Sequence, residues 1–150
     1  MRVGGHAYGV PVAAVVEVIR MVALASLPGA APWMAGMADL RGVPVPVVDL
    51  AARLGHEPRT PILDRRIVVT AGSGGPAGLV GLVVDEVDGV APAGEAVASA
   101  GAAPLVRAAA RVGDEIVVVL DEAALRPDGD GGAGPAPTGE ARTRQARTTT

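Results

Sequence analysis

The chain has 150 residues, of which 49% are hydrophobic, and carries a net charge of −3. This fits one ordinary domain or two small subdomains with a sizeable core. Cysteine is absent, which excludes disulfides, thiolate catalysis and cysteine-bound metals. The positive charges are all arginines, scattered without a basic stripe interleaved with aromatic residues, so nucleic-acid binding has no support.

One uncharged run, residues 21–38, has the length of a membrane span. Polar, proline and glycine residues interrupt it: Ser26, Pro28, Gly29, Pro32 and Gly36. We therefore expect a buried loop there and no direct membrane insertion. The N-terminal residues lead into an alternating pattern without a secretory signal, which predicts a cytoplasmic protein.

The N-terminal twenty residues show the period-two alternation of strands. We expect residues 1–3 to pair with residues 7–10 across a glycine turn, and a further strand over residues 13–20. In that strand Glu17 shares a face with Val15 and Ile19. A carboxylate on an apolar face must stay hydrated or meet a cation.

A β-hairpin is expected around Arg41 and Gly42, between strands over residues 37–40 and 43–48. Glycine supplies the positive φ that a tight turn needs. An arginine at a hairpin tip is either a solvated turn residue or a group offered to a partner. Before the hairpin, residues 31–35 are expected to form one helical turn.

The second half of the chain continues in short strands. Asp49 is expected to cap a helix over residues 50–54 that Gly55 ends. Residues 56–64 are interpreted as a linker between two halves, and residues 91–104 as a long surface connection. Further strands are expected at residues 66–71, 78–87, 106–112 and 115–120. Residues 127–150 lack large apolar side chains and are predicted to be disordered.

No converging set of catalytic groups is found. His6 and His56 are the only histidines, and both are expected in turns, solvated and without metal-ligand spacing. Asp85, Glu86 and Asp88 cluster at a strand end, where solvation is a simpler interpretation than a calcium site. We expect no enzyme activity, no metal and no cofactor.

Four segments appear in an order that resembles the CheW-like domain of bacterial chemotaxis coupling proteins, over residues 2–126. They are the strand Val15-Val16-Glu17-Val18-Ile19, the hairpin from Asp39-Leu40-Arg41-Gly42 to Asp49-Leu50, the strand at residues 80–87, and the strand at residues 113–120. Each segment alone is a weak signal, but the ordered set is specific.

The resemblance implies an all-β fold of two small five-stranded SH3-like β-barrel subdomains with a few short helices and a shared core. It places their division near residues 56–64, with chain ends that can cross between the halves. It implies a non-catalytic adaptor that couples methyl-accepting chemoreceptors to a histidine kinase of the CheA type, in receptor arrays at the inner membrane. The implied partner-binding residues are Val15, Glu17, Leu40, Arg41 and Gly42, with Glu17 and Arg41 paired across neighbouring strands.

Two alternatives remain open from the sequence. One is a CheW-like scaffold for a histidine kinase outside motility. The other is a small metabolite-binding β-barrel, which would need a deep apolar pocket with converging polar groups.

Overall fold

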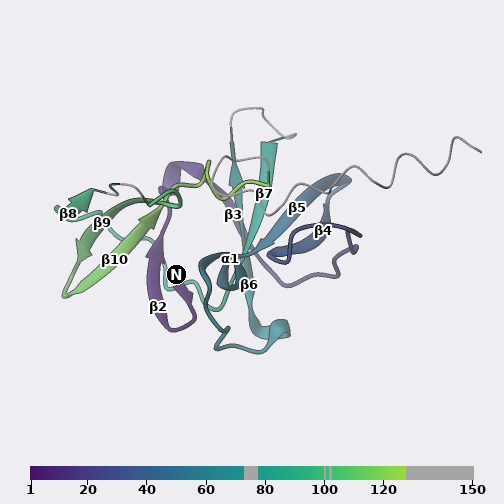
Figure 1. Cartoon of the computed structure of the whole chain (residues 1–150), viewed down its shortest axis with the longest axis horizontal. Helices are drawn as coiled ribbons and strands as arrows, with labels where there is room; N and C mark the ends of the chain where they lie inside the picture. Colours follow the sequence, from purple (N-terminus) through teal and green to yellow (C-terminus); the bar gives the residue numbers. More distant parts are fainter. Residues whose placement is uncertain (73–77, 100, 102, 128–150) are drawn as a thin grey trace, which may run out of the picture.

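The computed structural model describes residues 1–72, 78–99, 101 and 103–127 (Figure 1). Within these residues, ten strands form two five-stranded sheets joined by short helical segments. The expected all-β class with two five-stranded units is confirmed. The turn expected between the strands at 66–71 and 78–87, and the tail after Pro127, lie outside the described residues.

The first sheet has the strand order β3-β6-β7-β5-β4. Its strands are β3 (Val15–Arg20), β4 (Met34–Leu40), β5 (Val43–Asp49), β6 (Arg66–Ala71) and β7 (Leu79–Val84). The sheet closes on itself because Ala25, downstream of β3, exchanges two backbone hydrogen bonds with Met37 of β4, at 2.8 and 2.9 Å. The two edge strands β3 and β4 are therefore brought together.

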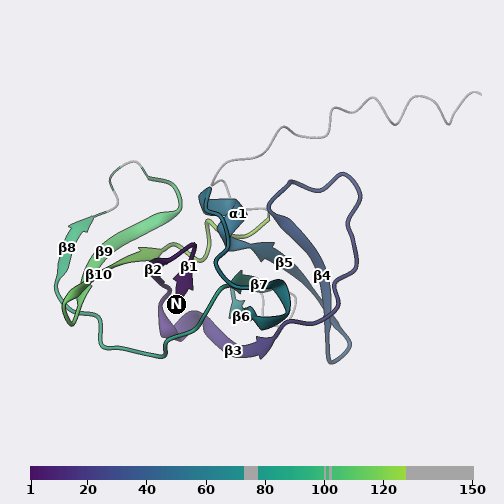
Figure 2. The ribbon, with the colours of Figure 1, turned by 90° about the horizontal axis from the view of Figure 1, so that it is seen from below.

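The second sheet has the order β1-β2-β10-β9-β8. Its strands are β1 (Arg2–Val3), β2 (His6–Gly9), β8 (Ala96–Ser99), β9 (Val106–Val112) and β10 (Glu115–Leu120). β2 pairs in parallel with β10, so the first two strands of the chain complete the sheet made by the last three. The two sheets lie side by side in Figure 2, with β8, β9 and β10 on the left and β4 and β5 on the right.

Short helical segments connect the strands: η1 (Val12–Ala14), α1 (Leu50–Leu54) and η2 (Ile62–Asp64). The expected caps of α1 are present. Asp49 Oδ1 accepts from Ala52 N at 3.2 Å, and Gly55 takes a left-handed φ of 75°. No helix among the described residues is long and apolar enough to cross a membrane.

Three expectations differ from the structure. Residues 56–64 join α1 to β6 within the first sheet, and the sheets divide instead between β2 and β3 and between β7 and β8. The proline-rich, charged composition of that segment marks an exposed connection, not a change of sheet. Residues 91–104 contain β8, whose small side chains carry little strand signal. The segment expected as a helical turn contains the start of β4, at Met34.

The central strands β6 and β7 of the first sheet are buried on both faces, which explains their continuous apolar runs. The interior of its barrel is filled by one cluster of buried side chains: Ala38, Val47, Ile67, Val69 and Val83. A second, larger cluster covers the opposite face and includes Val48, Val68, Val80, Leu82 and Val84.

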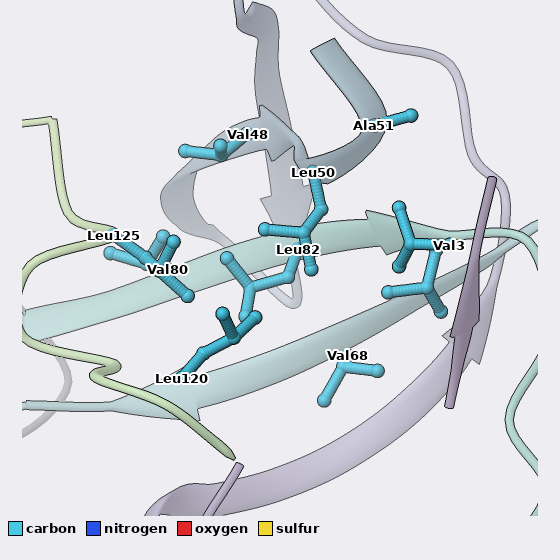
Figure 3. Packing of buried hydrophobic residues seen from close by; sticks show 10 residues of the cluster. Val3, Val48, Leu50, Ala51, Val68, Val80, Leu82, Leu120 and Leu125 are labelled. Carbon is cyan, nitrogen blue, oxygen red and sulfur yellow. The ribbon is translucent and has the colours of Figure 1, made fainter. Parts of the chain in front are cut away.

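This larger cluster, the shared core, also contains side chains from the second sheet and the turn after it (Figure 3). Val3 of β1, Leu120 of β10 and Leu125 are each at most 1% exposed and pack against the first sheet. Leu50 and Ala51 of α1 complete the cluster. The two sheets are therefore held together by one hydrophobic core.

Candidate partner-binding site

The β4–β5 hairpin ends in a two-residue tip formed by Arg41 and Gly42, because Leu40 pairs with Val43. Both tip residues have positive φ, 53° for Arg41 and 84° for Gly42, as a type I′ turn requires. Asp39 Oδ1 accepts from the Gly42 backbone N–H at 2.7 Å. The tip is thus fixed by its own hydrogen bond as well as by the strands.

Arg41 is the non-glycine residue with positive φ in the part of the chain that the structure describes. A left-handed conformation costs about 1–2 kcal/mol for a residue that carries a Cβ, whereas asparagine and glycine tolerate it. The local backbone therefore does not favour arginine, which indicates that its side chain has another role.

The Arg41 side chain reaches Glu17, and Arg41 Nη2 donates to Glu17 Oε1. Glu17 lies on the inward-facing side of β3, 26% exposed, and Arg41 is 74% exposed. The expected pair is therefore formed, and it bridges the two edge strands where the barrel closes. A partly exposed pair contributes about 0.2–1 kcal/mol to stability.

The five expected site residues differ in how far they are exposed. Glu17, Arg41 and Gly42 meet at the hairpin tip, whereas Val15 packs against the shared core and Leu40 against the barrel interior. Val16 and Val18, on the outward face of β3, are the exposed apolar neighbours. The period-two alternation of β3 puts Val16 and Val18 on the face opposite Glu17, so these two residues could have been identified from the sequence.

Asp85 differs from its expected surroundings. It is 5% exposed and accepts backbone hydrogen bonds from Gly4 at 2.8 Å, Arg59 at 3.1 Å and Thr60 at 3.3 Å. Gly4 and Arg59 donate to Oδ2 and Thr60 to Oδ1, and Arg65 Nε lies 3.8 Å from Oδ1. The interpretation of Asp85 as a solvated strand-end residue is therefore wrong. The sequence pattern did not reveal its burial, because its hydrogen-bond donors come from segments distant in the sequence.

Glu86 and Asp88 are exposed, as expected. Within the described ranges, no group of three or more histidine, cysteine or acidic side chains has the geometry to hold a metal ion.

His6 is exposed, as expected, although it begins β2 instead of lying in the turn, and His56 is partly buried. The His56 ring stacks on His6 with centroids 4.5 Å apart, and its Nε2 shares a hydrogen bond with the Tyr8 hydroxyl. Burial raises the pKa of Tyr8. These contacts join β2 to the segment after α1, so the histidines belong to the junction between the sheets.

The geometry defines a two-sheet β protein with a charged hairpin tip at its surface. The sequence model of the CheW-like domain matches residues 1–128. The chain therefore belongs to the CheW-like domain family.

Individual relatives agree with this assignment. The chain is 33% identical over 89 residues to a probable chemotaxis protein CheW of Rhizobium etli, covering 59% of this chain and 56% of that protein. It is 36% identical over 89 residues to protein PilI of Pseudomonas aeruginosa, covering 59% of this chain and 48% of that protein. The matched segment thus spans about half the length of these relatives.

A solved structure shows the same fold. The crystal structure of the scaffolding protein TtCheW from Thermoanaerobacter tengcongensis superposes with a TM-score of 0.75 at 25% identity. The match covers 87% of this chain and 90% of TtCheW.

Proposed function

We propose that the protein is a non-catalytic adaptor that couples methyl-accepting chemoreceptors to a histidine kinase of the CheA type. Family membership supports this function, as does the likeness to a scaffolding protein over most of both chains. Such an adaptor works in the cytoplasm, at receptor arrays on the inner membrane.

The observation that carries the proposal is the Arg41 tip. Its backbone is held in a conformation unfavourable to arginine, and its guanidinium is anchored by Glu17 yet largely exposed. An exposed arginine whose side chain is already fixed by an ion pair is a frequent energetic hot spot of protein interfaces. It loses little side-chain conformational freedom on binding and offers several hydrogen-bond donors. The proposed contact region comprises Val15, Glu17, Leu40, Arg41 and Gly42.

The test is a pull-down with the receptor and the kinase that co-purify with the protein. Arg41→Ala is expected to weaken capture of at least one of them by about ten-fold, the loss typical of an interface arginine. Arg20→Ala is the matched control, because Arg20 is exposed on β3 and forms no ion pair within the described residues. Unchanged capture of both partners by a folded Arg41→Ala protein refutes the role.

The pathway is a separate question, since one relative is named for chemotaxis and another is protein PilI. If the kinase captured in the pull-down can be deleted without any effect on swimming, the adaptor belongs to a signalling pathway outside motility. Binding of a metabolite without any protein partner would favour the small-molecule barrel.

A further inference from the structure

Two histidine rings from different sheets meet where the sheets join. His6 begins β2 of the second sheet, and His56 lies after α1, in the connection that leads to β6 of the first sheet. Their rings stack with centroids 4.5 Å apart and an interplanar angle of 24°. In Figures 1 and 2 the β1–β2 hairpin lies between the first sheet and the rest of the second. The stack therefore links the first sheet to the hairpin that connects the two.

The backbone on both sides of the stack is held in place. The His56 N–H donates to Ala51 O at 2.8 Å, which fixes His56 at the end of α1. A Cβ on Gly4 would lie 2.5 Å from His56 Cβ, so the β1–β2 turn packs directly against this residue. His6 follows the turn and pairs with Val3 across the hairpin. The two rings therefore cannot move far apart unless the hairpin moves.

The Tyr8 hydroxyl lies 2.5 Å from His56 Nε2, and this contact suits either charge state of the ring. The hydroxyl donates to a neutral ring that has its proton on Nδ1, and it accepts from the Nε2–H of a protonated ring. One proton on His56 therefore costs no hydrogen bond, and a charged ring stacks favourably on a neutral one. A second proton, on His6, places two positive rings 4.5 Å apart, where they repel.

The charged groups next to the stack do not offset this repulsion. The Arg59 guanidinium carbon lies 3.5 Å from the position that a Cβ on Gly5 would take, beside His6, and adds a third positive charge. Glu57, which follows His56, is exposed, so solvent screens its charge. Within the described ranges, no acid lies at ion-pair distance from either histidine ring.

The other acids of this region are already paired. Asp85 accepts from backbone N–H groups of the β1–β2 turn and of the connection before η2, and Arg65 lies beside it. Asp88 and Glu115 both pair with Arg2. The strand next to β2 is β10, whose two residues paired with β2 are uncharged valines. A doubly protonated stack would therefore keep its repulsion.

We propose that His6 and His56 form an acid-sensitive clasp between the two sheets, which stays closed with one proton and loosens when both rings are protonated. Histidine changes its charge between about pH 5 and 8 in ordinary surroundings. The opened chain takes up both protons freely, whereas the closed clasp resists the second. The opened state therefore binds more protons, and the stability of the junction falls as the pH falls through this range.

The first test is thermal unfolding of the full chain at about pH 7.5 and at about pH 5.5, on either side of the ordinary histidine value. We expect the midpoint of wild type to fall by about 3 °C more than that of His6→Gln, which keeps one ring and cannot carry two charges. Tyr8→Phe is the matched control, because it removes the hydroxyl contact but keeps both rings. It is expected to retain the wild-type pH dependence.

Hydrogen exchange in the wild-type protein locates the effect. The Tyr8 N–H donates to Met1 O at 3.0 Å within the β1–β2 hairpin, whereas Val68 lies in β6, which is paired on both sides. On the same acidification, the protection factor of the Tyr8 amide is expected to fall about five-fold relative to that of Val68. In His6→Gln the ratio of the two protection factors is expected to stay constant.

Equal midpoint changes in wild type and His6→Gln would overturn the inference. Loss of the pH dependence in Tyr8→Phe would also overturn it, because the hydroxyl contact would then be the sensitive group. Equal loss of protection at Tyr8 and Val68 would mean that acid acts on the whole fold and not on the clasp. The inference goes beyond the proposed adaptor function and is independent of it, since none of these measurements uses a receptor or a kinase.

Discussion

Asp85 holds three segments of the chain together through its two carboxylate oxygens. It accepts hydrogen bonds from the turn after β1 and from the connection before η2, and Arg65 lies beside it. Asp85→Asn removes the charge and turns a donor toward backbone N–H groups. We expect a loss of about 3 kcal/mol in the free energy of unfolding, measured in urea.

The neighbouring Glu86 is exposed and supplies the control. Glu86→Gln is expected to change stability by no more than about 0.5 kcal/mol. Equal effects of the two substitutions would contradict the structural role of Asp85.

Glu115 gives a prediction of pH dependence. Arg2 donates two hydrogen bonds to its carboxylate, at 2.5 and 2.8 Å, and these lower the pKa of Glu115 from 4.5. Because the folded-state pKa lies below the unfolded one, the stabilisation is complete above about pH 4.5 and is lost as the pH falls through the lower, folded value. The stability advantage of wild type over Glu115→Gln should therefore shrink on acidification below pH 4.5.

Thermal unfolding across that range measures the difference. Asp114→Asn, on the same hairpin, is the control, because Asp114 forms no ion pair within the described ranges. A wild-type advantage over Glu115→Gln that is constant down to the acid limit would contradict the prediction.

Residues with local roles could be predicted from the sequence, and residues with distant partners could not. The cap at Asp49 and the left-handed Gly55 depend on neighbours within a few positions, so their pattern is visible in the chain. The burial of Asp85 and the stacking of His56 depend on residues brought together only by the fold. The pair of Glu17 and Arg41 was predictable because a family resemblance supplied the adjacency of their strands.

Among the elements, β8 is an edge strand of its sheet. It pairs with β9 alone, and its Val97 is 49% exposed. Few buried contacts mean a low free energy of local opening. In hydrogen exchange, the amides of residues 96–99 should exchange faster than those of residues 67–70 in β6, which is paired on both sides.

Equal protection of the two strands would contradict that ranking. It would show that β8 is stabilised by contacts beyond its single neighbour.

The same contrast explains which elements the sequence could predict. β5 and β6 are rich in valine, and strong apolar patterning marks them as strands. β8 consists of alanine, valine and serine, a composition shared with connections. β4 begins at Met34 because Met34 pairs with Val48 across the hairpin, a tertiary preference that overrides the local helical pattern.

For the molecule as a whole, the shared core makes the two sheets one cooperative unit. Leu120 belongs to the second sheet but packs on the first, so Leu120→Ala should destabilise both. We expect a loss of about 2–5 kcal/mol for a buried leucine truncated to alanine. Leu63→Ala is the control, because Leu63 is 82% exposed.

Trp33, the single tryptophan of the chain, packs against the shared core and reports on its integrity. Tryptophan fluorescence and far-ultraviolet circular dichroism should give the same unfolding midpoint for wild type and for Leu120→Ala. Two separate midpoints would mean that the sheets unfold independently.

The parallel pairing of β2 with β10 has a consequence for biosynthesis. Tyr8 faces Val118, so the N-terminal hairpin leaves the ribosome long before its partner strand is made. β3 to β7 are contiguous in the chain and can assemble first, with the apolar face that later receives Leu120 and Leu125 still uncovered. The nascent chain therefore passes through a stage in which this apolar face is exposed and prone to aggregation, and the stage ends once the last third of the domain has been translated.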